Sequence, residues 1–155
     1  MLIEKNNEPV ETPHLKIAQF NFFVREQMNK QKEMKNFYKL VTSEFTLDAK
    51  QADKVYRELG FDKEDKAYYI WFECFAEVTN MLMKENDKDN VLKHFSFFTS
   101  YLNNGTDVIK NCIDVSYIEN LFWKVDKETS ELFWPLLPKQ MQELYIDFHG
   151  LKPTE

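Results

Sequence analysis

The sequence predicts an all-α fold, a single-domain helical bundle of about six or seven helices around an aromatic-rich core. Two observations predict it. The 155 residues include only three glycines and five prolines, and none of the prolines lies between residues 14 and 134. A β protein of this size needs many tight turns, and therefore more of both residues. Aromatic side chains make up 15% of the chain, with 14 phenylalanines, and large rings give a small helical domain a deep core.

The N-terminal part sets the domain boundaries that we expect. Residues 1–12 are polar and should form a frayed segment, residues 13–150 one helical domain, and residues 151–155 a C-terminal tail. Thr12 and Pro13 suit the cap and first position of a helix. Helical spacing runs from residue 13 to about 30, and again from about 31 to 45. These two stretches are either one bent helix or a hairpin.

The middle of the chain predicts two helices. One covers residues 48–59, with Thr46 or Asp48 as cap and Gly60 as stop. Its inward residues are expected to be Ala52, Val55, Tyr56 and Leu59. The longest helix is predicted from about 63 to 86, with Asp62 as cap and an almost wholly apolar circumference, which places it at the centre of the bundle. Its one polar stripe consists of Lys66, Glu73, Glu77, Asn80 and Lys84.

Three further helices are predicted towards the C-terminus. The first begins at Asp87 or Asp89 and ends at Gly105, and Thr106 caps a second helix that runs to about residue 125. The short connection predicts that these two pack antiparallel. Pro138 opens the last helix and Gly150 closes it. The expected apolar faces of these helices are Val91, Phe95, Phe98 and Leu102, then Val108, Cys112, Val115 and Phe122, then Met141, Leu144, Tyr145 and Phe148. Trp123, Phe133 and Trp134 are expected to be core or corner residues.

Charge is unevenly distributed along the chain. The net charge is −6, but residues 13–45 carry six basic and three acidic side chains, and residues 46–155 carry 13 basic and 20 acidic ones. Only two of the 20 basic residues are arginines. An acidic, arginine-poor chain is a poor candidate for binding nucleic acid. It is better suited to a basic protein partner.

Motifs for catalysis, metals and membranes are absent from the sequence. There is no GxSxG, no Gly-rich phosphate loop, no CxxC or HExxH, and no apolar run long enough to span a bilayer. We therefore expect no catalytic residue, cofactor, bound metal or membrane partner, and a cytoplasmic location because the N-terminus lacks the pattern of a signal peptide. Cys74 and Cys112 are expected to be buried free thiols. No motif fixes the oligomeric state.

Three carboxylates stand out. Glu73 and Glu77 are spaced i, i+4, so they form either an acid/base pair, a docking point for a cationic group, or the solvated edge of a buried helix. Glu119 is predicted to point into the apolar face of its helix. A buried carboxylate must be hydrogen-bonded, paired or protonated, so Glu119 is either a structural acceptor or a site residue with a raised pKa.

A set of mostly aromatic side chains is predicted to lie half outside the core. Aromatic residues in such positions serve as anchors in protein interfaces. The alternative is that a neighbouring helix or the N-terminal segment covers them. The candidates for partner binding are His94, Phe97, Tyr101, Tyr117 and Leu121, together with Glu73 and Glu77.

Residues 88–123 resemble small, poorly characterised bacterial helical proteins of the toxin-immunity type. The resemblance consists of an aromatic-rich helix, an Asn-Gly turn and a second helix that ends in apolar residues around a Glu. It is carried by Phe95, Leu102, Gly105, Val108, Ile118, Glu119 and Leu121, and loosely by Pro138 and Tyr145. Hairpins of this kind also occur in HEAT-like scaffolds. The resemblance implies no catalytic residues.

These observations leave three functional hypotheses. The first is a non-catalytic protein-binding module, most concretely a bacterial immunity protein that covers the active surface of a cognate toxin. A basic toxin suits the acidic charge of residues 46–155. The second is a small helical enzyme or ligand binder that uses Glu119, or Glu73 with Glu77. The third is a helical scaffold or regulatory adaptor.

Overall fold

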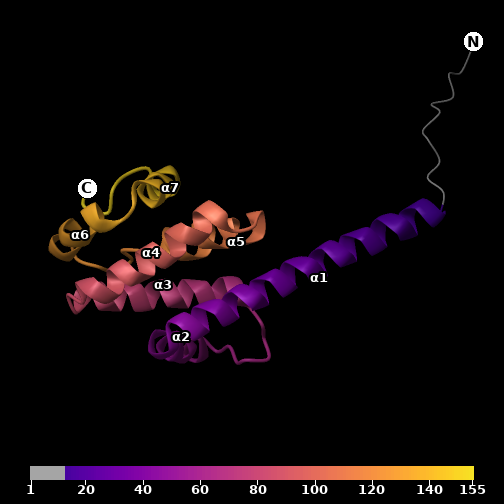
Figure 1. Ribbon diagram of the computed structural model, residues 1–155, viewed down its shortest axis with the longest axis horizontal. Helices are drawn as coiled ribbons and strands as arrows, with labels where there is room; N and C mark the ends of the chain where they lie inside the picture. Colours follow the sequence, from indigo (N-terminus) through magenta and orange to yellow (C-terminus); the bar gives the residue numbers. More distant parts are fainter. Residues whose placement is uncertain (1–12) are drawn as a thin grey trace, which may run out of the picture. The chain divides into compact units, whose positions relative to one another are not determined.

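The computed structural model describes residues 13–155 (Figure 1). Within that range the chain forms ten helical segments and no strand. The fold is therefore all-α, as the sequence predicts. Residues 33–155 form one compact unit. The helices are α1 (Pro13–Glu44), α2 (Thr46–Glu58), α3 (Tyr68–Lys84), α4 (Lys88–Asn104), α5 (Asp107–Cys112), α6 (Lys127–Phe133) and α7 (Lys139–His149). None of them is long and apolar enough to cross a membrane.

The first helix settles the alternative for residues 13–45, because α1 is a single helix of 32 residues. Its last part buries three side chains in the core, Met34, Phe37 and Val41. Its first part is different. Over residues 13–32 several large apolar side chains are exposed, namely Ile17, Phe20, Phe22, Phe23 and Met28. The predicted frayed segment, residues 1–12, lies outside the described residues.

Helix α3 is the central element, as predicted, and packs against α2, α4 and α6 (Figure 1). It is shorter than expected, because the chain before Tyr68 is a turn. Asp62 accepts the Glu64 N–H and Asp65 accepts the Asp62 N–H, at 2.8 and 2.6 Å. Aspartates compete in this way with helical hydrogen bonding. Asp62 therefore forms the turn and does not cap the helix.

The connection after α4 is short, as predicted, but the helix that follows it differs from the prediction. Thr106 caps α5 as expected, but α5 ends at Cys112, followed by a π turn (Ile113–Tyr117) and a 3-10 turn (Ile118–Asn120). The Asn120 side chain donates to the Ser116 carbonyl at 2.7 Å. It thereby competes with the backbone N–H that would donate to this carbonyl in a continuous α-helix. The predicted single helix to residue 125 is therefore wrong.

Several burial predictions hold and several fail. The apolar face of α4 is buried as predicted, and so are Phe133 and Trp134. Leu59 and Phe148 were expected to face inward, but they are 60% and 58% exposed. Trp123, expected to be a core or corner residue, lies in a turn and is 62% exposed. In contrast, Asn80 of the predicted polar stripe is fully buried.

Candidate functional site

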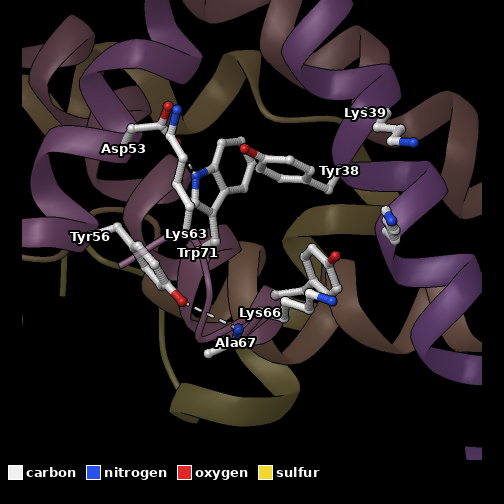
Figure 2. Close-up of a pocket in the computed structure, with 10 residues that line it drawn as sticks. Tyr38, Lys39, Asp53, Tyr56, Lys63, Lys66, Ala67 and Trp71 are labelled. Atoms are coloured by element: carbon white, nitrogen blue, oxygen red, sulfur yellow. Dashed lines mark hydrogen bonds between the residues drawn. The ribbon is translucent and has the colours of Figure 1, made fainter. Parts of the chain in front are cut away.

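A pocket of about 240 Å³ opens between the end of α1, helix α2, the turn before α3 and the start of α3 (Figure 2). All four segments belong to the compact unit of residues 33–155. We call it the lysine pocket, and it is lined by Lys35, Tyr38, Lys39, Asp53, Tyr56, Lys63, Lys66, Ala67, Tyr68 and Trp71.

The base of the lysine pocket is aromatic and internally fixed. Trp71 is buried and donates its indole N–H to Asp53 at 2.8 Å. Tyr38 meets Trp71 edge-to-face, with ring centroids 4.8 Å apart. The Tyr56 hydroxyl accepts the Ala67 N–H at 3.2 Å, a bond drawn in Figure 2. Because these contacts tie α1, α2 and α3 together, the shape of the pocket is set by the fold.

The charge of the lysine pocket is opposite to that of the whole chain. Four lysines contribute to its lining against a single carboxylate, that of Asp53, and this carboxylate already accepts the Trp71 indole N–H. The residues that line this hollow therefore carry a net positive charge in a chain of net charge −6, and the carboxylates of Asp62 and Asp65 lie near enough to act on Tyr56. Lysine ammonium groups are mobile point charges that suit carboxylates and phosphates.

The tyrosines of the lysine pocket remain neutral hydrogen-bonding groups. Burial, followed by the Asp53 charge, raises the pKa of Tyr38 above its ordinary value. Burial also raises the pKa of Tyr56 and of Tyr68. The three rings therefore keep their phenolic protons near neutral pH and add apolar area around the charged rim.

Glu73 and Glu77 line a second hollow of about 290 Å³, which we call the tryptophan pocket. Glu73 is exposed and Glu77 is half-buried. Although Glu73 is exposed, desolvation by the surrounding protein raises the pKa of its carboxyl. The structure thus places these two predicted candidates at one site, together with Val55, Leu59, Cys74, Trp123 and Lys124.

His94 and Tyr117 were predicted as surface anchors, and this is wrong because both are fully buried. They belong to one hydrogen-bonded chain of side chains. His94 Nε2 lies 2.7 Å from an Asp48 carboxylate oxygen, and His94 Nδ1 lies 2.9 Å from the Thr79 hydroxyl. The Tyr117 hydroxyl lies 3.0 Å from the same Thr79 oxygen. These polar groups hold helices α2, α3 and α4 and the π turn together.

Leu121 is covered, which is the alternative that the sequence left open, whereas Phe97 and Tyr101 lie half outside the core, as predicted. Leu121 is buried, and Phe97 and Tyr101 are half-buried against the core. Phe37 of α1 covers both rings, with centroid distances of 6.2 Å to Phe97 and 5.1 Å to Tyr101. Leu121 is therefore inaccessible to a partner, and part of the Phe97 and Tyr101 rings is packed against α1.

Glu119 was predicted to be buried, but its side chain is only partly buried, in the 3-10 turn. Burial, and then the nearby Asp114 charge, raise the pKa of its carboxyl. Its carbonyl oxygen, not its carboxylate, accepts the His149 ring N–H at 2.9 Å. Glu119 lines neither of the two pockets.

The cysteines are free and buried, as predicted. Burial is the main cause that raises the pKa of each thiol to about 12, so both are poor nucleophiles at neutral pH. Within residues 13–155 no group of three or more His, Cys, Asp or Glu side chains is placed to hold a metal ion.

Sequence reasoning missed the lysine pocket, although its parts were visible. The basic character of residues 13–45 includes Lys35 and Lys39, and the aromatic run that starts at Tyr68 includes Trp71. The link between them is the turn at residues 62–67, which brings Lys63 and Lys66 to the same hollow. Predicting this segment as a helix placed these two lysines elsewhere.

Comparisons with known proteins give one match. Residues 44–150 match a family described as a domain of unknown function (DUF7674). The match includes α2 to α7 and excludes almost all of α1. No curated protein and no solved structure matches the chain.

Proposed function

This chain belongs to the DUF7674 family, a domain of unknown function, and we propose that it is a non-catalytic, cytoplasmic protein-binding module. Its binding site in this proposal is the lysine pocket, which receives an acidic segment of another protein. The observation that carries the proposal is the cluster of four lysines around a fixed aromatic base in a chain of net charge −6.

The size of the lysine pocket favours side chains over a whole cofactor. Pockets that enclose a drug-sized molecule measure roughly 300–1,000 Å³, whereas the lysine pocket has about 240 Å³. Aromatic side chains with a charged rim are also what protein interfaces use as anchors. No histidine and no pair of carboxylates lines this pocket, so it lacks the side chains that most often act as acid and base near neutral pH.

The most concrete form of this proposal is a bacterial immunity protein, as the resemblance of residues 88–123 implies. The target would be a toxin with an overall basic surface, because residues 46–155 carry 20 acidic and 13 basic side chains. That toxin would place one acidic segment in the lysine pocket. The opposite charges of the two proteins, and of the lysine pocket and the acidic segment, speed association and fix the orientation of the complex.

Two assays test the proposal on the full chain. The first is a pull-down against the product of the adjacent gene, and the second is a rescue assay in cells that express both proteins. The double variant Lys39→Glu, Lys63→Glu reverses two charges at the rim of the pocket. We expect it to lower the affinity by about tenfold or more and to abolish rescue.

The matched control is Lys93→Glu with Lys139→Glu, because both lysines are exposed and line neither pocket. This variant has the same net charge as the test variant and should keep both binding and rescue. An equal loss in both variants would show that only net charge matters and would contradict the pocket. No binding and no rescue by the unchanged protein would contradict the immunity role.

A further inference from the structure

The residues that line the tryptophan pocket carry a net negative charge, whereas those that line the lysine pocket carry a net positive one, and the two pockets share no residue. The lining of the tryptophan pocket is mostly apolar, and two of its side chains are exposed to an unusual degree for their type, Trp123 at 62% and Leu59 at 60%. A tryptophan is usually largely buried, so an exposed indole at the mouth of a hollow points to a binding surface.

The loop that carries Trp123 is fixed in a costly conformation. Phe122 and Lys124, on either side of it, have φ angles of 64° and 53°, which non-glycine residues seldom adopt. The buried side chain of Asn80 holds this loop, since it accepts the Phe122 N–H at 2.8 Å and donates to the Asn120 carbonyl at 2.9 Å. The backbone next to Trp123 is therefore held by the core before any ligand arrives, which lowers the entropy cost of ordering this loop on binding.

The charged groups of the tryptophan pocket favour a cationic ligand. Two carboxylates, those of Glu73 and Glu77, and one ammonium group, that of Lys124, contribute to its lining. Both carboxylates lie near the buried Cys74 thiol, because after burial their charges are the next causes that raise its pKa. The π face of an indole also attracts cations, and arginine stacks on it more often than lysine does.

We propose that the tryptophan pocket binds an arginine side chain of a partner protein, with the guanidinium between the Trp123 indole and the carboxylates of Glu73 and Glu77. The aliphatic part of the arginine lies along Val55 and Leu59 in this arrangement. A guanidinium is planar and offers five N–H donors, so it can contact a ring face and a carboxylate at once.

The experiment uses the full chain and two blocked tripeptides, one with arginine between two glycines and one with glutamine in its place. Binding is followed by NMR on the indole N–H of Trp123 and the backbone amides of Val55 and Leu59. The arginine peptide should shift these signals to saturation, and the glutamine peptide should not. The double variant Glu73→Gln, Glu77→Gln should lower the affinity about tenfold.

Two further variants make the result specific. Trp123→Ala removes an exposed side chain, so the fold should persist while the affinity falls about fivefold, measured on the amides of Val55 and Leu59. Glu143→Gln, an exposed carboxylate on α7, is the control and should leave the affinity unchanged. Equal shifts with both peptides, or an unchanged affinity in the double variant, would overturn the proposal. Loss of the lysine pocket's function would leave these results unaffected.

Discussion

At the scale of single residues, the chain of hydrogen bonds from Asp48 through His94 and Thr79 to Tyr117 is the main polar feature of the core. The Thr79 hydroxyl also lies 3.3 Å from the Phe75 carbonyl, which can only accept. The Asp48 carboxylate accepts from His94 Nε2, which leaves His94 Nδ1 as the acceptor of the Thr79 hydroxyl proton. Tyr117 then donates to the Thr79 oxygen, and each of these side chains has a partner.

We predict that His94→Ala lowers the free energy of unfolding by about 3–5 kcal/mol. The substitution leaves Asp48 and Thr79 without a shared partner. It also opens a cavity between Phe45 and Phe75, whose ring centroids lie 4.7 and 4.8 Å from that of His94. Urea denaturation followed by circular dichroism measures the effect.

The control for this substitution is the neighbouring exposed residue on the same helix. Lys93→Ala should change the free energy of unfolding by less than about 0.5 kcal/mol. A loss for His94→Ala that is no larger than the loss for Lys93→Ala would show that the hydrogen-bonded chain contributes little to stability.

At the scale of helices and their connections, glycines end three segments for two different physical reasons. Gly60 and Gly150 have φ angles of 95° and 79°, the left-handed conformation that the sequence suggests for a glycine after a helix. Gly105 is extended instead, with φ −77° and ψ 170°. A Cβ atom at Gly105 would lie 2.5 Å from the Tyr101 carbonyl oxygen. Glycine is therefore needed there for space, not for its dihedral angles.

We predict that Gly105→Ala lowers the free energy of unfolding by about 1–3 kcal/mol, the typical cost of overpacking. The contacted atom belongs to the backbone of α4, so the end of the helix must shift to relieve the clash. Thermal unfolding should show a lower Tm. The control is Asn103→Ala, an exposed position in the same turn, which should be close to neutral.

An unchanged Tm for Gly105→Ala would mean that the connection between α4 and α5 adapts without cost. That result would also mean that the N-terminal cap of α5 adapts to the substitution. The Thr106 hydroxyl, which accepts the Ile109 N–H, is directly adjacent to Gly105 and would move with it.

At the scale of the whole molecule, the core of residues 33–155 extends beyond the part that matches the family. The match begins at residue 44, but Met34, Phe37 and Val41 of α1 are at most 2% exposed. Phe37 contacts rings of both α3 and α4, with its centroid 5.1 Å from that of Phe72 and 6.2 Å from that of Phe98. The end of α1 is therefore a structural part of this domain.

We predict that Phe37→Ala lowers the free energy of unfolding by about 3–5 kcal/mol, as for a large ring in a core. Chemical denaturation of the full chain measures it, and the exposed neighbour Asn36→Ala serves as control with a change below about 0.5 kcal/mol. A loss of less than about 1 kcal/mol would place α1 outside the cooperative core.

The sequence by itself determined the fold class and much of the apolar pattern. The fold class followed from the small number of glycines and prolines, the helical spacing, and the caps at Asp87 and Thr106. Each of these signals involves only residues close together in the sequence. For the same reason the burial of the α4 face and the central position of α3 could be predicted. The placement of Glu73 and Glu77 on one face of α3 followed from their i, i+4 spacing, whereas the pocket beside them did not.

Only the tertiary structure decided which side chains are exposed and which are hydrogen-bonded to residues far away in the sequence. His94 and Tyr117 are buried because Asp48 and Thr79, from other helices, satisfy their polar atoms. No spacing within one helix could show this. The lysine pocket likewise joins α1, α2 and the start of α3 across a turn formed by aspartates. Burial and pockets depend on contacts between segments far apart in the chain, and a helical pattern records only the contacts within one segment.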